Sequence, residues 1–110
     1  MRHLPRLALP FLLLLPGWVV VAGDAPASTE MIRLVRQDCG ACHGMTLKGG
    51  LGKPLTREAL AGQSPEALAV IILHGKEGTA MPPWKSLLSE AQARWIAEQL
   101  IAGFPEEPQP

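Results

Sequence analysis

Cys39, Cys42 and His43 stand within five consecutive residues, Cys39-Gly40-Ala41-Cys42-His43. Two thiols three positions apart can each add across one vinyl group of haem, and the imidazole that follows them is then placed beneath the iron. The small Gly40 and Ala41 let the backbone turn tightly against the porphyrin edge. The motif therefore predicts a covalently attached haem c, one per chain, with His43 as an iron ligand.

Three other kinds of site use a pair of cysteines at this spacing. A redox-active thiol pair sits at a strand-to-helix junction of a mixed α/β chain, whereas this pair follows an expected helix. A zinc site needs four ligands, and His74 is the further candidate of the usual type. A structural disulfide is the third alternative. The adjacent His43 and the export signal described below favour haem attachment.

The opposite face of the haem needs a ligand from a distant segment of the chain. Met31 and Met45 lie too close to the motif in sequence to reach that face readily. Met81 lies much further along the chain, and Pro82 and Pro83 stiffen the loop directly after it. Methionine is more commonly a filler of the core, but this loop context favours Met81 as the second axial ligand.

The elements that position these residues are expected to be helices. Thr29 can cap a helix that leads into the motif. A second helix begins at Ser64-Pro65-Glu66, with a capping side chain and a proline at its first position, and ends at Gly75. A capping box at Ser89 begins a third helix, which Gly103 ends. The expected helices are about 30–38, 65–74 and 90–102, with a short turn of helix at about 56–61.

Apolar spacing predicts which helix faces are buried. In the second helix the expected inward residues are Leu68, Ile71 and Ile72, and in the third helix they are Ala93, Ile96, Ala97 and Leu100. No stretch alternates apolar and polar residues over the length of a strand, so the fold class is all-α. Three short helices bury little apolar area, and a chain of this size usually needs a cofactor or cross-link.

Composition excludes several classes of protein. The chain has 110 residues, which is enough for one small domain, and 47% of them are hydrophobic against 18% charged. Ten basic and ten acidic residues give a net charge of zero, so the chain lacks the excess of basic residues that is typical of a nucleic-acid-binding protein. No nucleic-acid partner is expected.

The N-terminal residues have the pattern of an export signal. Arg2 and Arg6 precede an apolar run from Leu7 to Ala22, and small residues follow it. This run contains two prolines and is short for a membrane-spanning helix, so membrane contact is expected only if the N-terminus is not cleaved. We expect residues 1–23 to be a signal peptide and residues 24–110 to be an exported, periplasmic domain. Its core covers about 29–103, and 104–110 is expected to be a flexible tail.

The cysteine motif, the Gly49-Gly50-Leu51-Gly52 segment, and Met81-Pro82-Pro83 before a closing helix resemble the pattern of class I c-type cytochromes. This resemblance covers about residues 29–103 and implies a small cytochrome c fold, with three main helices around one covalently attached haem. It implies thioether bonds at Cys39 and Cys42, and His43 and Met81 as axial ligands. It also implies that the first and last helices pack across one another and that one haem edge is exposed.

Two positions depart from the pattern of that family. Lys53 separates Gly52 from Pro54, so the backbone carbonyl that accepts the His43 imidazole N–H is left open. The last helix has Leu100 where an aromatic residue often lies at the helix crossing, and Trp95 stands nearer its start.

The single haem motif, the export signal and the Met-Pro-Pro-Trp loop are similar to the small cytochrome c55X type of denitrification gene clusters. That resemblance implies single-electron transfer to or within the cytochrome cd1 nitrite reductase system, by a carrier that is not an enzyme. Two alternatives remain: an accessory role in haem d1 biosynthesis or maturation of the reductase, and a ligand-binding haem sensor with a displaceable Met81. Scattered lysines more commonly form only a solvated surface, but four lysines that flank the segments expected around the haem edge can also steer an acidic partner: Lys48, Lys53, Lys76 and Lys85.

Overall fold

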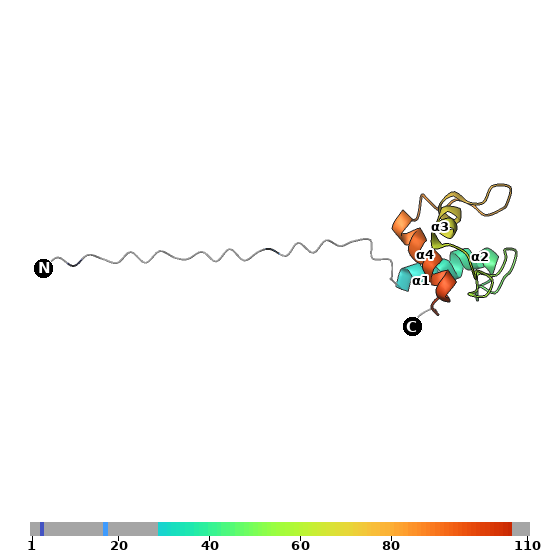
Figure 1. Ribbon diagram of the computed structural model, residues 1–110, viewed down its shortest axis with the longest axis horizontal. Helices are drawn as coiled ribbons and strands as arrows, with labels where there is room; N and C mark the ends of the chain where they lie inside the picture. The colour runs from blue at the N-terminus through green and yellow to red at the C-terminus, as the bar shows by residue number, and fades with distance from the viewer. Residues whose placement is uncertain (1–2, 4–16, 18–28, 107–110) are drawn as a thin grey trace.

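The computed structural model in Figure 1 describes residues 3, 17 and 29–106. The expected signal peptide, 1–23, lies outside the described residues except at His3 and Gly17, and residues 107–110 of the expected tail lie outside them too. Within the described part, no helix has the length and apolar character needed to cross a membrane.

Every regular element of the described residues is helical, which confirms the all-α class. The longest helical stretch at the N-terminal side combines three elements that follow one another without a break (Figure 1). Two longer helices follow after extended loops. In chain order the elements are α1 (Thr29–Leu34), the π-helix η1 (Val35–Cys39), α2 (Gly40–His43), α3 (Pro65–His74) and α4 (Glu90–Ala102).

The first helical stretch ends at His43, and the expected end near Asp38 is wrong. The Gly40 N–H donates to the Val35 carbonyl, an i to i+5 bond that widens this turn into a π-helix and carries the chain onward. Gly44, at φ 90°, then ends the helix in a conformation that favours glycine. Both cysteines and His43 are therefore helical residues.

The two later helices begin and end where their capping residues predicted. The Ser64 hydroxyl accepts from the Ala67 N–H at 3.0 Å, and Pro65 stands at the first position of α3. Ser89 and Gln92 form both bonds of the capping box that begins α4, at 2.9 and 3.1 Å. At about 56–61, where a short turn of helix was expected, the Leu60 N–H donates to the Thr56 carbonyl at 3.0 Å in a turn that does not form a helix.

The core lies between α3, α4 and the first helical stretch. All four inward residues predicted for α4 are buried, and Ala93 and Ala97 have no exposed surface. In α3 the buried residues are Ala69, Ile72 and Leu73, while Leu68 and Ile71 are only half-buried. The inward face of α3 is thus rotated from the predicted one. The remaining buried apolar residues are Met31, Val35, Leu47, Leu60 and Leu88.

Two arginines from earlier segments hold the C-terminal end of α4. Arg36, only 8% exposed, donates from Nη2 to the carbonyls of Phe104 at 3.2 Å and Pro105 at 2.8 Å. Arg57 donates to the Ala102 carbonyl through Nε at 3.1 Å and through Nη2. The Ala102 carbonyl lies at the negative end of the helix dipole and has no partner within the helix, so the Arg57 guanidinium satisfies and stabilises it. The Phe104 and Pro105 carbonyls lie just beyond α4, and Arg36 ties that segment to the first helical stretch.

The expected flexible tail does not include its first two residues. The Phe104 ring packs edge-on against Trp95, with 6.0 Å between ring centroids, and both residues pack against the core. Together with the Arg36 bonds to the backbone, this contact makes Phe104 and Pro105 part of the packed domain. The last helix has Leu100 where the family often has an aromatic residue. In this structure Trp95 and Phe104, which lies just beyond α4, form an aromatic pair.

Candidate functional site

His43, at the end of α2, is held by a hydrogen bond from its own ring. Its Nδ1 lies 2.7 Å from the Lys53 carbonyl oxygen. A carbonyl can only accept, so Nδ1 carries the hydrogen and Nε2 keeps its lone pair. This is the tautomer and orientation that a histidine needs to bind a metal through Nε2. The acceptor that the sequence left open is therefore Lys53.

The glycine-rich segment after the motif brings the Lys53 carbonyl to the ring. The Gly52 N–H donates to the Cys42 carbonyl at 2.7 Å, and the Gly49 N–H donates to the His43 carbonyl at 2.8 Å. A Cβ at Gly52 would lie 2.8 Å from two atoms of the His43 ring. The backbone thus passes directly against the imidazole, which only glycine permits.

The two cysteines are one helical turn apart, and neither is in a disulfide. Cys39 is half-buried against the core, and Cys42 is exposed. Burial, aided by the charge of Asp38, raises the pKa of the Cys39 thiol to about 11. Redox-active thiol pairs depend on a lowered thiol pKa, so the environment of Cys39 is unlike theirs. No group of three or more His, Cys, Asp and Glu side chains that suits a metal ion occurs among the described residues.

Met81 reaches the core from a separate segment, the loop between α3 and α4. Its side chain is half-buried and packs against the core, as does Trp84. The loop after α2 and the loop that carries Met81 extend from the helices toward the same side of the molecule, on the right in Figure 1. The structure thus brings Cys39, Cys42 and His43 together on one helical stretch. Within the described residues, Met81 has no hydrogen bond to that stretch.

Exposed apolar and basic side chains lie on these two loops. Leu51, next to the glycine that touches the imidazole, is 96% exposed. All four candidate lysines are exposed, two on each loop: Lys48, Lys53, Lys76 and Lys85. His74, the other possible ligand, is an exposed residue at the end of α3 and has no place in a cluster of metal-binding side chains among the described residues.

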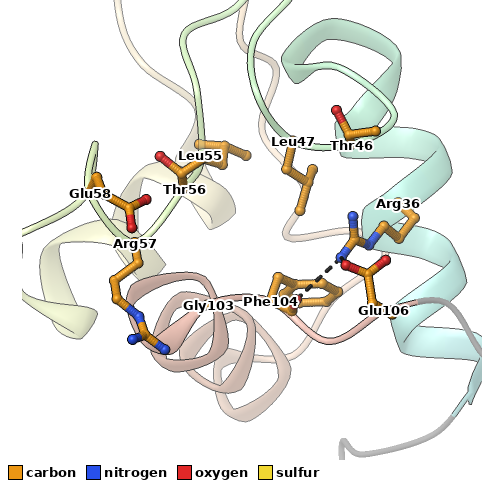
Figure 2. A pocket seen from close by; sticks show the side chains of 10 residues that line it. All are labelled: Arg36, Thr46, Leu47, Leu55, Thr56, Arg57, Glu58, Gly103, Phe104 and Glu106. Atoms are coloured by element: carbon orange, nitrogen blue, oxygen red, sulfur yellow. Dashed lines mark hydrogen bonds and ion pairs between the residues drawn. The ribbon is translucent and has the colours of Figure 1, made fainter.

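Two hollows lie on the described part of the surface, and neither is lined by Cys39, Cys42, His43 or Met81. One of about 270 Å³ lies beside the end of α4, between Arg36 and Arg57, with Leu47 and Phe104 in its wall (Figure 2). The other, of about 450 Å³, lies between α3 and α4 and includes His74. Neither hollow therefore competes with the His43 region as a place for the predicted chemistry.

Comparison with known proteins decides the family. The family model described as cytochrome c oxidase, cbb3-type, subunit III, matches residues 26–99. Cytochrome c55X of Paracoccus denitrificans (strain Pd 1222) is 54% identical over 98 residues, which cover 87% of this chain and 93% of the relative. The chain belongs to the class I c-type cytochromes and is of the c55X type.

A solved structure and a longer relative are consistent with that assignment. The structure of the c-type cytochrome NirC is 46% identical to this cytochrome, with a TM-score of 0.68, and the match covers 73% of this chain and 94% of the other. The dihydro-heme d1 dehydrogenase of Pseudomonas aeruginosa (strain PAO1) is 38% identical over 96 residues, which cover 87% of this chain but 19% of the relative. The longer protein thus contains a region similar to most of this cytochrome.

Membership of this family makes the chain an electron-transfer protein that uses haem c, and not an enzyme. The residues present fit that group. They supply two free thiols one helical turn apart, an imidazole with its Nε2 lone pair free, and a thioether on a loop toward the same side. The sequence did not identify the Lys53 carbonyl as the acceptor for the His43 ring or Gly52 as the residue that lies against that ring. The run of glycines after the motif could have indicated that the backbone passes close to the imidazole.

Proposed function

We propose that the cytochrome carries one haem c, covalently attached through Cys39 and Cys42, with His43 and Met81 as axial ligands. The observation that carries this proposal is the 2.7 Å hydrogen bond from His43 Nδ1 to the Lys53 carbonyl, which leaves Nε2 to the metal. When bound, haem c supplies reversible one-electron chemistry at its iron. A mass spectrum recorded under denaturing conditions should show one added haem, and free thiols at both cysteines would contradict the proposal.

The chain's own residues set how that chemistry proceeds. The Lys53 carbonyl fixes the imidazole and increases its basicity as a ligand. A thioether from Met81 favours the ferrous state, and the half-buried position of Met81 against the core lowers the local dielectric, which also favours the less charged iron. We therefore infer a positive reduction potential and a closed, low-spin iron, which excludes substrate chemistry at the metal.

The protein acts in the periplasm, to which residues 1–23 direct it as a signal peptide, and it exchanges electrons there with a larger redox protein. We assign that partner to the cytochrome cd1 nitrite reductase system of denitrification, on the resemblance to the c55X type. Leu51 is an exposed apolar side chain, and the two loops that extend toward this side of the molecule carry four exposed lysines (Figure 1). Such a surface suits brief docking to an acidic partner, in which charges speed the encounter.

Stopped-flow mixing of the reduced cytochrome with oxidised nitrite reductase tests this assignment. We expect rapid oxidation of the cytochrome that slows as the salt concentration rises, because exposed charges are screened. Leu51→Ser should slow the transfer, whereas the matched control Val70→Ser, at a side chain 57% exposed on α3, should not. Equal slowing by both variants would contradict the proposed docking surface.

A second function is favoured by the longer relative. That protein is named a dihydro-heme d1 dehydrogenase, and one region of it resembles this cytochrome. The cytochrome would then pass electrons during maturation of haem d1 rather than to the finished reductase. Negligible transfer to the reductase at all salt concentrations, together with accumulation of immature haem d1 in a deletion strain, would replace the first function with this one.

A further inference from the structure

The segment that carries Met81 is closed at both ends on the last turn of α3. The Gly75 N–H donates to the Ile71 carbonyl at 2.8 Å, and the Trp84 N–H donates to the Ile72 carbonyl at 3.0 Å. These acceptors are carbonyls near the helix end, some of which would otherwise have no partner. The two ends of the loop are therefore fixed, and the position of Met81 depends on what holds the loop between them.

One side chain inside this loop makes hydrogen bonds to its backbone. The Thr79 hydroxyl donates to the Lys76 carbonyl at 2.7 Å and accepts from the Met81 N–H at 3.3 Å. A hydroxyl has one donor and two acceptor sites, so both bonds can exist together. The Thr79 N–H also donates to the Lys76 carbonyl at 3.1 Å. Among the described residues, no other side chain is hydrogen-bonded to the Met81 backbone.

A direct backbone contact also closes this loop, at a length close to that of the Met81 N–H bond to Thr79. The Lys76 N–H lies 3.4 Å from the Met81 carbonyl, at the long end of the range for a hydrogen bond. Gly75 permits this close approach, since a Cβ there would lie 2.7 Å from the same carbonyl. The Met81 side chain packs against the core. Within the described part of the chain, the hydrogen bonds of Met81 are made by its backbone, and Thr79 is the side chain that takes part, because it joins the Met81 N–H to the Lys76 carbonyl.

We propose that Thr79 is the positioning residue for Met81, and that its hydroxyl sets how readily the thioether leaves the iron. This inference rests on the proposed function, because it takes Met81 as the axial ligand. Thr79 does not contact the metal; it acts by tying the Met81 N–H to the Lys76 carbonyl. Without the hydroxyl, the open form of the loop is more populated, and a ligand from solution binds the iron through that form.

The size of the effect follows from the exposure of the bonds. Thr79 is exposed, so water competes for both partners of its hydroxyl. The apparent affinity of an added ligand is proportional to the fraction of molecules in the open form. Loss of the net stabilisation from one hydrogen bond should therefore raise the affinity for imidazole by about fivefold.

The test is a titration of the ferric, haem-loaded protein with imidazole, followed by its absorbance spectrum. Thr79→Val and Thr79→Ala should bind imidazole about fivefold more tightly than the unmodified protein, whereas Thr79→Ser, which keeps the hydroxyl, should match it. Thr56→Val is the matched control, because the Thr56 hydroxyl accepts from the Ala59 N–H at 3.2 Å in a turn remote from Met81. Denaturant unfolding of each variant separates an effect on the loop from an effect on the whole fold.

The outcomes separate the two proposals. If Thr79→Val binds imidazole like the unmodified protein, or if Thr56→Val shifts the affinity equally, Thr79 is not a positioning residue, and the ligand set stands. If the ferric protein lacks the near-infrared band of sulfur-to-iron charge transfer, and Met81→Ala does not change imidazole binding, then Met81 is not a ligand and both proposals fail. Tighter binding in Thr79→Val and Thr79→Ala alone supports the inference.

Discussion

The His43 ring has a hydrogen bond of its own, at 2.7 Å to the Lys53 carbonyl, whereas the hydrogen bonds of Met81 in the described part are made by its backbone and its side chain packs against the core. Around His43, the backbone of the glycine-rich segment lies against the ring itself. Around Met81, a Cβ at Gly75 would lie 2.7 Å from the Met81 carbonyl, and the side chain packs against the core. One proposed ligand is thus fixed in direction by a hydrogen bond, and the other is fixed in position by its backbone and by packing.

This difference assigns unlike roles to the two loops. A hydrogen bond to the far nitrogen of an imidazole fixes both the tautomer and the direction of the lone pair, so that ligand stays bound. A thioether has no second polar atom through which a hydrogen bond could orient it, and it is a weak ligand. Whether it stays bound to the iron therefore depends on how tightly the loop is closed. Substitutions near His43 should therefore affect whether haem is held, and those near Met81 whether the iron is open.

The largest effect is expected at Gly52. In Gly52→Ala the new Cβ would lie 2.8 Å from the His43 ring, which must move away from the Lys53 carbonyl. Overpacking of this kind costs about 1–3 kcal/mol. We expect a strongly reduced ratio of haem to protein, measured by absorbance and intact mass. Gly62→Ala is the control, since Gly62, at φ 81°, also strains the backbone of a loop when substituted but has open space around its Cβ position. Equal haem loss in both variants would mean that strain in a loop, and not contact with the His43 ring, causes the loss.

Gly75→Ala should affect the other loop. Gly75 has φ 73° and ψ −179°, a conformation that is open almost only to glycine and costs other residues about 1–3 kcal/mol. We expect haem to stay attached while imidazole binds more tightly and the near-infrared band weakens. If Gly75→Ala loses haem as Gly52→Ala does, the contrast between the two loops is wrong.

Loss of the arginine bonds at the C-terminal end of α4 should lower the stability of the whole fold without a selective effect on His43 or Met81. Arg36→Met removes the buried guanidinium from the Phe104 and Pro105 carbonyls and should lower the free energy of unfolding by about 1.5–3 kcal/mol. Arg57→Met, at an exposed residue that bonds Ala102, should cost less. Denaturant unfolding measures both costs. A changed imidazole affinity in Arg36→Met would mean that the Arg36 bonds also control the Met81 loop.

The smallest effect is expected on the exposed face of α3 and α4. Backbone hydrogen bonding at the start of α3, followed by the charge of Arg94 at 2.7 Å, lowers the pKa of Glu66. Because the folded-state pKa is lowered, this group stabilises the fold above its ordinary pKa, and that contribution is lost as the pH falls through the folded value. NMR titration should show the lowered pKa and its partial return in Arg94→Gln. An unchanged Glu66 pKa in that variant would exclude Arg94 as a cause.

The parts of the fold that follow local rules were predictable from the sequence. Ser64 with Pro65, and Ser89 with Gln92, mark helix starts by capping bonds made within four residues, and both starts are confirmed. The π-helical turn before Cys39 was not predicted, because no side chain marks the wider Gly40 to Val35 bond. Its consequence, a helix that continues through His43, was missed with it.

Contacts between distant segments were beyond local rules. The sequence predicted His43 as a ligand but left its acceptor open, because a backbone carbonyl is the same at every residue and only the path of the loop selects Lys53. Arg36 likewise reaches a carbonyl 69 residues away, and no spacing in the sequence signals that bond. The Thr79 bonds are local, but threonine in an exposed loop is common, so the residue type alone gave no reason to select it.

The near-infrared spectrum of the ferric protein tests the ligand assignment most directly. The band of sulfur-to-iron charge transfer should be present in the unmodified protein and in Met45→Leu, and lost in Met81→Leu, because we propose Met81, on the loop between α3 and α4, as the ligand. Haem attachment, read from the denatured mass, should be the same in all three proteins. A band that survives in Met81→Leu, or that is lost in Met45→Leu, would contradict the assignment of Met81 and with it the contrast between the two loops.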